Sequence, residues 1–543
     1  MHSLYTRGRH GRRFAARNAA PFALLALVAT LLLQAPLRAH SADGEAGLAT
    51  LRTYCAGCHT ESTPGQFQRL SVIRKSPEGW LMTIFRMQHV HGLSLPEAER
   101  DTIIKYLADT QGLAPAESAA GRFALERRPN AQDLQLGDDL PVMCGRCHTL
   151  ARVALQRRDA DEWLKHMHMH VGQFPSLEYQ ASGRDRFWWQ TATTVLPAKL
   201  GKLFPLDTPE WRAWKSAKHA DPSGEWLVRG RTPGSGDFFG TLSVKASGAD
   251  NYTAQWSVQY ADGKSATSTS KVRVYTGYEW RGSSQWGDVD AREVFALSED
   301  GKRLTGRWFE AQHTEVGGDL SAERAEGPAA VLAVSPRALK VGTTQDVMIS
   351  GRGLKGAVSF GAGTRTKLLG SAPGLLRVSV SVDAKAAAGA RSVTVGKTSA
   401  AQMAVVYDRV DRLQVLPAFA IARVGGGKTA PVIAQFEAFG FLEPRAGSAV
   451  HEAIPLGPMN VNWKVAPRNE DAVKADDVKF AGHIDATGKF MPAAAGPNPE
   501  RKYASNNAGD LSVIASVEQG GAPVSGDSHL IVTVQRWNTP PIY

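Results

Sequence analysis

The chain has 543 residues, more than one hydrophobic core usually supports, so about three to five domains are expected. Hydrophobic residues make up 43% and charged residues 21%, which is typical of a globular chain. The net charge is +11, but the first 39 residues hold six arginines and no acid, and removing these six charges leaves +5. A charge this mild does not indicate nucleic-acid binding.

The N-terminal segment is basic and then apolar. Its arginines are Arg7, Arg9, Arg12, Arg13 and Arg17. The apolar run covers residues 21–37, and small residues follow at Ala39 and Ala42. This layout predicts a secretory signal peptide over residues 1–42, cleaved near Ala39 or Ala42, and an exported mature chain. The alternative is an uncleaved anchor, since the run is at the short limit for a membrane-spanning helix.

All four cysteines of the chain stand in two Cys-x-x-Cys-His motifs. The first is Cys55, Cys58 and His59, and the second is Cys144, Cys147 and His148. This pattern is the attachment signature of c-type haem, with both thiols bonded to one porphyrin and the histidine as the proximal iron ligand. A disulfide, a zinc site and a thioredoxin-like redox pair are the alternatives. A zinc site would need two more ligands nearby, and the βαβ pattern of a thioredoxin is not evident.

Each motif is followed by a segment with a helical pattern and a tryptophan. Gly-Trp-Leu at residues 79–81 aligns with Glu-Trp-Leu at residues 162–164. Farther on, Arg100-Asp101 matches Arg184-Asp185 within one residue. We therefore predict an all-α di-haem cytochrome c region of two duplicated modules, over residues 43–117 and 118–207. In the first module, Ser94 and Glu97 have capping-box spacing before the apolar stripe of Ile103, Ile104 and Leu107.

The alignment places Met87 opposite His170, each seven residues after its tryptophan and on the same helical face. Met87 is the candidate distal ligand of the first haem and His170 that of the second. Other candidates remain: Met82, His89 and His91 in the first module, and His166, Met167, His168 and Met169 in the second. Because methionine ligation raises the haem potential, electrons are expected to flow from the second haem to the first. Trp188 and Trp189 are expected to be core residues or to line the second haem.

The segment over residues 207–224 has the composition of a polar connector, and strand patterns dominate beyond it. Tyr252, Ala254, Trp256, Val258 and Tyr260 alternate with polar residues. Three all-β domains are predicted: an antiparallel barrel or sandwich over residues 208–326, an immunoglobulin-like sandwich over 327–407, and a C-terminal sandwich over 408–543. No catalytic motif is present in this half. Its scattered histidines are interpreted as surface or packing residues, namely His219, His313, His451, His483 and His529.

The whole layout resembles the alpha subunit of quinohemoprotein amine dehydrogenase. The resemblance is carried by the order of the domains and by the strings EGWLMTIFRMQ, IIKYLADTQGLAP and VGQFPSLEYQASGRDRFWW. It implies a periplasmic heterotrimer that oxidatively deaminates primary amines. In that family a small gamma subunit carries cysteine tryptophylquinone and a beta subunit is a β-propeller. One haem is bis-histidine and the other is histidine–methionine.

The resemblance further implies that this chain passes electrons from the quinone to a soluble cytochrome c or blue copper protein. Both haems together use every cysteine, so the chain cannot itself hold a cysteine-derived quinone. Two other functions are open. One is a stand-alone di-haem peroxidase, which requires an open iron position. The other is a non-catalytic electron carrier whose β-domains bind a surface.

Overall fold

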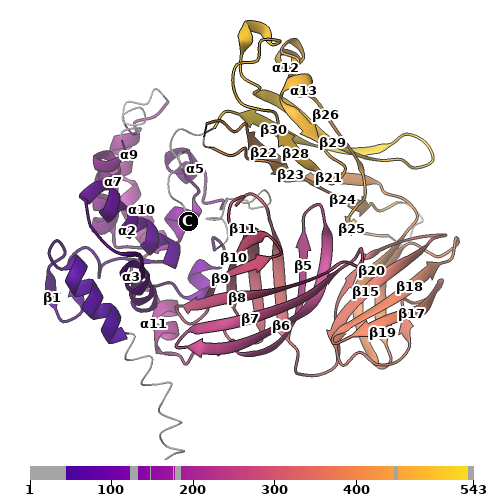
Figure 1. Cartoon of the computed structure of the whole chain (residues 1–543), viewed down its shortest axis with the longest axis horizontal. Coiled ribbons are helices and arrows are strands. Elements are labelled where there is room, and N and C mark those ends of the chain that lie inside the picture. The colour runs from indigo at the N-terminus through magenta and orange to yellow at the C-terminus, as the bar shows by residue number, and fades with distance from the viewer. Residues whose placement is uncertain are drawn as a thin grey trace, which may run out of the picture.

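The computed structural model describes residues 44–122, 133–146, 148–174, 177, 185–427, 429–445 and 450–535. The predicted signal peptide over residues 1–42, Cys147 and Arg184 lie outside these residues. The described chain forms four parts (Figure 1): a helical region, a β-barrel beside it, a β-sandwich beyond the barrel, and a C-terminal β-domain above them. None of the described helices has both the length and the apolar character needed to cross a membrane.

The N-terminal region is mainly helical. It begins with a helix over residues 44–55. Its further helices are α2 (Pro77–His91), α3 (Glu97–Thr110), α4 (Pro115–Ser118), α5 (Asp139–Met143), α6 (Ala151–Ala154), α7 (Ala160–Gln173), α9 (Trp188–Thr194), α10 (Leu196–Leu203) and α11 (Pro209–Ser216). The region also holds two antiparallel strand pairs that the sequence did not predict. These are β1 (Glu61–Thr63) with β2 (Gln66–Phe67), and β3 (Arg74–Lys75) with β4 (Gln156–Arg157).

The two long helices that carry the candidate distal ligands start in the same way. The side chain of Ser76 accepts a hydrogen bond from the Gly79 amide at the start of α2, and Asp159 accepts one from the Glu162 amide at the start of α7. Helix α2 ends at Gly92, whose φ of 71° is in the left-handed region that glycine tolerates. Helix α3 begins at Glu97 with Pro96 at the N-cap position and no side-chain cap, so the predicted capping box of Ser94 is not formed.

Eight strands form a closed antiparallel barrel. They are β5 (Gly224–Thr232), β6 (Gly236–Gly248), β7 (Asn251–Tyr260), β8 (Ser265–Tyr275), β9 (Glu279–Trp286), β10 (Val289–Leu297), β11 (Arg303–Glu310) and β12 (Gly317–Arg324). Each strand pairs with its neighbours in sequence, and β12 closes the barrel on β5. On β7 the side chains of Tyr252, Ala254, Trp256 and Val258 are buried, and those between them are not, as the alternation predicted.

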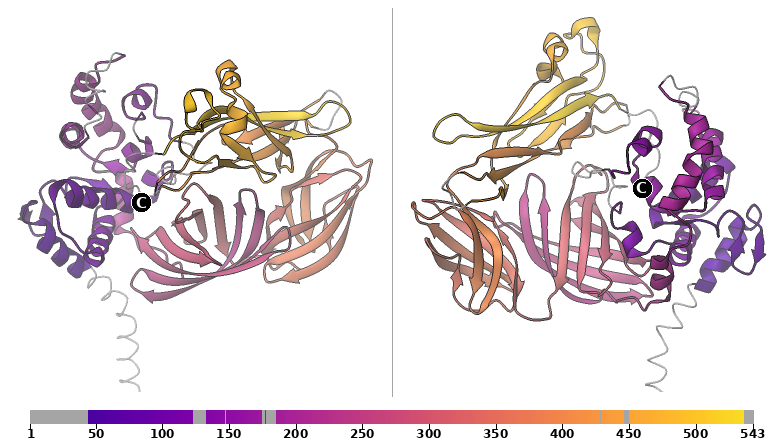
Figure 2. Two further views of the ribbon diagram at one scale, coloured as in Figure 1. Left: turned by 45° about the horizontal axis from the view of Figure 1, so that its top comes forward. Right: turned by 180° about the vertical axis from the view of Figure 1, so that it is seen from behind.

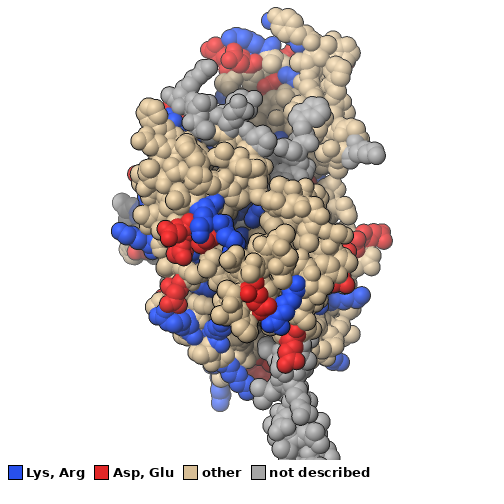
Figure 3. Space-filling view, turned by 90° about the vertical axis from the view of Figure 1, so that its left-hand side faces the viewer, with Lys and Arg blue, Asp and Glu red and all other residues tan. Residues whose placement is uncertain are grey.

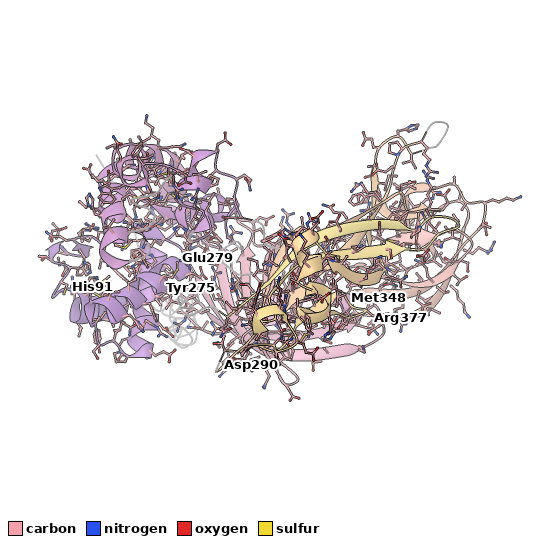
Figure 4. The ribbon with its side chains drawn as sticks, turned by 90° about the horizontal axis from the view of Figure 1, so that it is seen from above. His91, Tyr275, Glu279, Asp290, Met348 and Arg377 are labelled. Atoms are coloured by element: carbon pink, nitrogen blue, oxygen red, sulfur yellow. The ribbon has the colours of Figure 1, made fainter. Side chains whose placement is uncertain are left out.

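The sandwich beyond the barrel has two four-stranded sheets. The first contains β13 (Ala330–Ser335), β15 (Thr344–Arg352), β17 (Thr364–Ala372) and β18 (Leu375–Val382). The second contains β14 (Ala338–Lys340), β16 (Val358–Ser359), β19 (Gly389–Val395) and β20 (Thr398–Tyr407). Met348 packs with Phe239 of the barrel, so the two domains share a small apolar contact. Met348 and Arg377 mark this sandwich in Figure 4.

The C-terminal domain is more elaborate than the predicted sandwich. Its strands are β21 (Arg412–Leu416), β22 (Phe419–Arg423), β23 (Ala434–Gln435), β24 (Glu437–Leu442), β25 (Ile454–Pro458), β26 (Asn462–Pro467), β27 (Gly482–Ile484), β28 (Lys489–Pro492), β29 (Gly509–Val517) and β30 (Val524–Thr533). They form two three-stranded sheets and one four-stranded sheet. Two short α-helices, α12 (Glu470–Lys474) and α13 (Asp477–Phe480), and the 3-10 helix η1 (Lys502–Ala504) lie between strands. Figure 2 shows this domain over the barrel, and Glu437 pairs with Arg231 of the barrel.

The helical region packs against one end of the barrel through buried contacts. Helix α11, in the segment predicted to be a polar connector, inserts Trp211 and Trp214 into the barrel core. The Trp214 indole donates a hydrogen bond to the Thr276 carbonyl at 2.8 Å. The Tyr278 hydroxyl donates to the Leu113 carbonyl at 3.1 Å and contacts the Ser118 hydroxyl at 2.7 Å. Tyr275 and Glu279 mark this boundary in Figure 4. The barrel is therefore a rigid support for the helical region.

Candidate haem sites

The first Cys-x-x-Cys-His motif forms a tight turn at the end of a helix. The Cys58 and His59 amides both donate to the Cys55 carbonyl, at 3.2 and 2.9 Å. Cys55 and Cys58 are free thiols and do not form a disulfide. Burial, followed by the charge of Cys58, raises the pKa of Cys55 to about 11, so this side chain is a neutral thiol.

His59 is held in the orientation expected for a metal ligand. Its Nδ1–H donates to the Gln68 carbonyl at 3.0 Å, because a carbonyl oxygen can only accept. This bond leaves Nε2 unprotonated and available for an iron. The ring is half-buried, just beyond the two thiols. The residues of the first motif thus fit covalent haem attachment with His59 as the proximal ligand.

In the second module, the structure brings His148 and His170 together from two separate segments. Their ring centroids lie 6.4 Å apart with an interplanar angle of 39°. His148 Nδ1–H donates to the Thr149 carbonyl at 2.9 Å, and His170 Nδ1–H donates to the His166 carbonyl at 2.7 Å. Both Nε2 atoms are therefore left to bind a metal. Cys144 is half-buried and stands four residues before His148, and Cys147 lies outside the described residues.

This spacing fits two axial ligands of one iron. An imidazole nitrogen binds a transition metal at about 2 Å, so two axial imidazoles place their ring centroids on the order of 6 Å apart. Burial is the main cause that lowers the pKa of His148, and it lowers the pKa of His170 to about 4. Both rings are neutral at pH 7, which is the form that binds a metal. The ring pair therefore fits a bis-histidine haem.

The other candidates on α7 are placed differently. His168 is exposed, and its ring packs edge-on against Trp189 with centroids 5.0 Å apart. Met167 is buried in the core of the second module, together with Trp188. The His166 ring packs edge-on between Trp163 and His170, with centroids 5.9 and 4.8 Å away. Among the described residues, His170 is the α7 side chain that the ring contacts place near His148.

The distal ligand of the first haem stays a prediction. Met82 and Met87 are half-buried on α2. His89 is exposed and stacks on Phe85 with ring centroids 3.6 Å apart. His91, marked in Figure 4, is also exposed, and its Nε2 accepts a hydrogen bond from Gln173 of α7 at 3.1 Å. Gln173 engages the Nε2 atom of His91, whereas His89 donates from Nδ1 to the Phe85 carbonyl at 3.1 Å and keeps Nε2, so His89 stays an alternative to Met87.

A buried ion cluster, which sequence reasoning missed, joins the two modules. Strands β3 and β4 pair so that Arg74 lies opposite Arg157. Both arginines bind Glu117, with the Arg74 guanidinium 2.8 Å from each carboxylate oxygen and Arg157 Nε 3.1 Å from Oε1. Arg74 and Arg157 each stand six residues before the tryptophan of their own module, Trp80 or Trp163. The duplication alignment contains this signal, but the partner Glu117 becomes evident only in three dimensions.

Four family models match the chain in domain order. The haem-binding model of quinohemoprotein amine dehydrogenase A, alpha subunit, matches residues 45–211 and so spans both motifs. The models of alpha-subunit domains II, III and IV match residues 219–325, 328–408 and 413–542. The chain belongs to the quinohemoprotein amine dehydrogenase alpha-subunit family. The haem-binding assignment and the multidomain, β-rich organisation predicted from the sequence are thereby confirmed.

Other comparisons add little to this family assignment. No curated protein matches the chain. A designed fluorescence-activating β-barrel is 20% identical over 19% of this chain and 92% of its own, with a TM-score of 0.16. A mouse PcdhgC3 fragment is 10% identical over 45% of this chain and 77% of its own, with a TM-score of 0.15. These TM-scores are too low to bear on the function of this alpha-subunit family member.

Proposed function

We propose that this chain is the di-haem electron-transfer subunit of a periplasmic quinohemoprotein amine dehydrogenase. Family membership supports an oxidoreductase subunit that binds haem and works with partner subunits. The observation that carries the electron-transfer role is the proximity of His170 to His148 of the second Cys-x-x-Cys-His motif, with ring centroids 6.4 Å apart. A haem held by two axial side chains exchanges electrons without binding substrate. Export of the chain follows from the basic and apolar N-terminal segment.

The residues of this chain have distinct roles in that function. Cys55 and Cys58 would anchor one haem, and Cys144 and Cys147 the other. His59 and His148 are the proximal ligands, His170 is the distal ligand of the second haem, and Met87 that of the first. The carbonyls of Gln68, Thr149 and His166 hold the three imidazoles in the tautomer that leaves Nε2 for iron.

The cysteine count supports a quinone in another subunit. Both attachment sites together use all four cysteines, so none is left for a cysteine-derived quinone. We propose cysteine tryptophylquinone in a small gamma subunit, a β-propeller beta subunit, and a soluble cytochrome c or blue copper protein as acceptor. Electrons would enter at the bis-histidine haem, which has the lower potential, and leave through the histidine–methionine haem.

Figure 3 shows acidic and basic side chains interspersed on one face of the helical region, so this face has no patch of a single sign.

Purification of the native complex tests this proposal. Mass spectrometry of every co-eluting chain and a quinone redox stain should reveal a propeller subunit and a small quinone-bearing subunit. Anaerobic addition of a primary amine should reduce the haems of the complex. The isolated chain is the matched control and should stay oxidised, because it has no quinone. Haems that react with peroxide, or a chain that purifies as a monomer, would contradict the proposal.

A further inference from the structure

Three cationic side chains, two buried and one half-buried, lie where the two haem modules meet. Lys75 and Arg158 are 4% and 2% exposed, and Arg86 lies on α2 directly before Met87. Lys75 and Arg158 occupy equivalent positions in the duplication, each five residues before the tryptophan of its module. Each also packs over that tryptophan, with the charged atom 5.6 Å from the ring centroid of Trp80 or Trp163. We call Lys75, Arg86 and Arg158 the intermodule cations.

None of the intermodule cations forms an ion pair with a carboxylate of the described residues. Lys75 Nζ donates to the Thr83 hydroxyl at 2.6 Å, and Arg158 donates to the Gln156 side chain at 3.1 and 3.2 Å. Arg86 reaches the Thr83 hydroxyl at 3.3 Å, and its buried Nε has no acceptor within this part of the chain. Buried charges without a counterion are costly, so folded proteins nearly always pair them.

The fold pairs its other buried arginines at the same strand pair. Arg74 and Arg157, the neighbours of Lys75 and Arg158, share the carboxylate of Glu117. Two carboxylates, Glu162 and Asp159, act on Arg158 without forming an ion pair with it, and Glu162 is paired with Arg69 at 3.4 Å and Lys165 at 2.5 Å. The missing counterion is therefore specific to the intermodule cations and is not a general feature of this region.

The intermodule cations lie close enough to repel one another and to act on the second haem site. Burial, followed by the charges of Arg158 and Arg86, lowers the pKa of Lys75 well below its usual value. Burial also lowers the pKa of Arg158 to about 9. Arg158 lies over the Trp163 ring, which contacts the His166 ring, and the His166 and His170 ring centroids are 4.8 Å apart. A negatively charged group in this place would relieve the repulsion.

We propose that Lys75, Arg86 and Arg158 bind the propionate carboxylates of the second haem. This inference rests on the proposed function, because it requires a haem between His148 and His170. Haem carries two carboxylates that need counterions when its edge is buried. A guanidinium fork binds a carboxylate through two parallel hydrogen bonds, and a lysine adds a compact charge. Arg86 belongs to the first module, so haem binding in the second module would also tie the modules together.

The proposed propionate site predicts how loss of one cation shifts the midpoint reduction potential of the second haem. A cation near the haem disfavours the ferric state, which carries one more positive charge than the ferrous state. Replacing Arg86 or Arg158 by glutamine would leave a propionate without its counterion. The variants should therefore favour ferric haem and have a lower midpoint potential at the second haem. Both haems should stay attached, because the thioether bonds do not depend on these cations.

Potentiometric titration of holoprotein variants tests the proposal. Arg86→Gln and Arg158→Gln should each decrease the reduction equilibrium constant of the second haem at least tenfold, which is about 59 mV for one electron. Arg86→Lys should retain most of the wild-type potential. Arg212→Gln is the control, since Arg212 is 60% exposed in its pair with Asp207. Shifts in both glutamine variants no larger than that of Arg212→Gln would overturn the proposal.

A structure of the wild-type holo-complex gives a test that does not depend on variant folding. It should show a porphyrin carboxylate within about 4 Å of the Arg86 or Arg158 guanidinium, the usual limit for an ion pair. A protein carboxylate from another segment or subunit in that position would overturn the inference. A haem count below two would instead contradict the proposed function. Two haems with unchanged potentials would contradict the propionate site alone.

Discussion

Replacing Glu117 by glutamine should strongly destabilise the helical region. The carboxylate accepts hydrogen bonds from Arg74, Arg157, the Thr208 hydroxyl and the Ala114 amide, at 2.8 to 3.1 Å. The side chains of Glu117, Arg74 and Arg157 are only 4, 5 and 7% exposed. A neutral amide would leave two buried guanidinium groups without a counterion.

The size of the effect follows from burial. Removing one partner of a buried ion pair costs about 3–5 kcal/mol. Since about 1.4 kcal/mol changes an equilibrium constant tenfold, the unfolding constant should rise by a factor of roughly 10² to 10⁴. Burial raises the pKa of Glu117, but Arg74 and the other donors outweigh it, and the net pKa is lowered. A lowered pKa contributes stability above the unfolded value of 4.5 that is lost as pH falls through the folded value.

Urea unfolding of the holoprotein, followed by tryptophan fluorescence and the Soret band, measures the loss. Glu97→Gln is the matched control, because Glu97 is 80% exposed in its pair with Arg100. Exposed pairs contribute about 0.2–1 kcal/mol. The difference between Glu117→Gln and wild type should shrink as pH falls below 4.5 and through the lowered folded pKa of Glu117. A loss at pH 7 equal to that of the control would refute the reasoning.

Three further predictions concern the haem ligands and the barrel contact. His170→Met should raise the midpoint potential of the second haem, because methionine ligation raises it. The control His168→Met, at an exposed position, should not change this potential. Equal midpoint potentials in the two variants would argue against His170 as the ligand. Met87→Ala should remove the distal ligand of the first haem iron, which would be seen as a high-spin spectrum and carbon monoxide binding. The control His89→Ala should leave this iron low-spin. A low-spin Met87→Ala protein would point to another ligand. Burial raises the pKa of Glu279 to about 7, so the folded state holds a proton and wild-type stability should fall as pH rises from about 4.5 to 7. In Glu279→Gln the melting temperature should depend less on pH across this range, whereas Glu299→Gln, on the exposed β10–β11 turn, should keep the wild-type dependence. A wild-type pH dependence in Glu279→Gln would show that Glu279 does not retain its proton.

Local patterns were enough to predict much of this molecule. The Cys-x-x-Cys-His motifs define their own geometry, because two intervening residues place the thiols and the histidine on one turn. The alternation around Trp256 predicted a strand of a barrel or sandwich, since period two is a property of the strand itself. The alignment of Met87 with His170 used helical period, and the structure places His170 beside His148.

Features that depend on distant partners were not predictable in the same way. Glu117 lies 43 residues from Arg74 and 40 from Arg157, and no local pattern links them. The residues around α11 are polar in composition, yet Trp211 and Trp214 close the barrel because a docking site exists there. Ser94 has the spacing of a capping residue, but the chain before α3 places Pro96 at the N-cap instead. In each case the tertiary environment determined the outcome.

The mass of the purified mature chain tests the central claim most directly. If both motifs hold covalent haem, the intact mass should exceed that of the polypeptide by two haem groups, and a thiol-alkylating reagent should add nothing to the denatured chain, since Cys55, Cys58, Cys144 and Cys147 are all consumed. A mass with one haem or none, or any alkylated cysteine among the four, would contradict a two-haem electron relay.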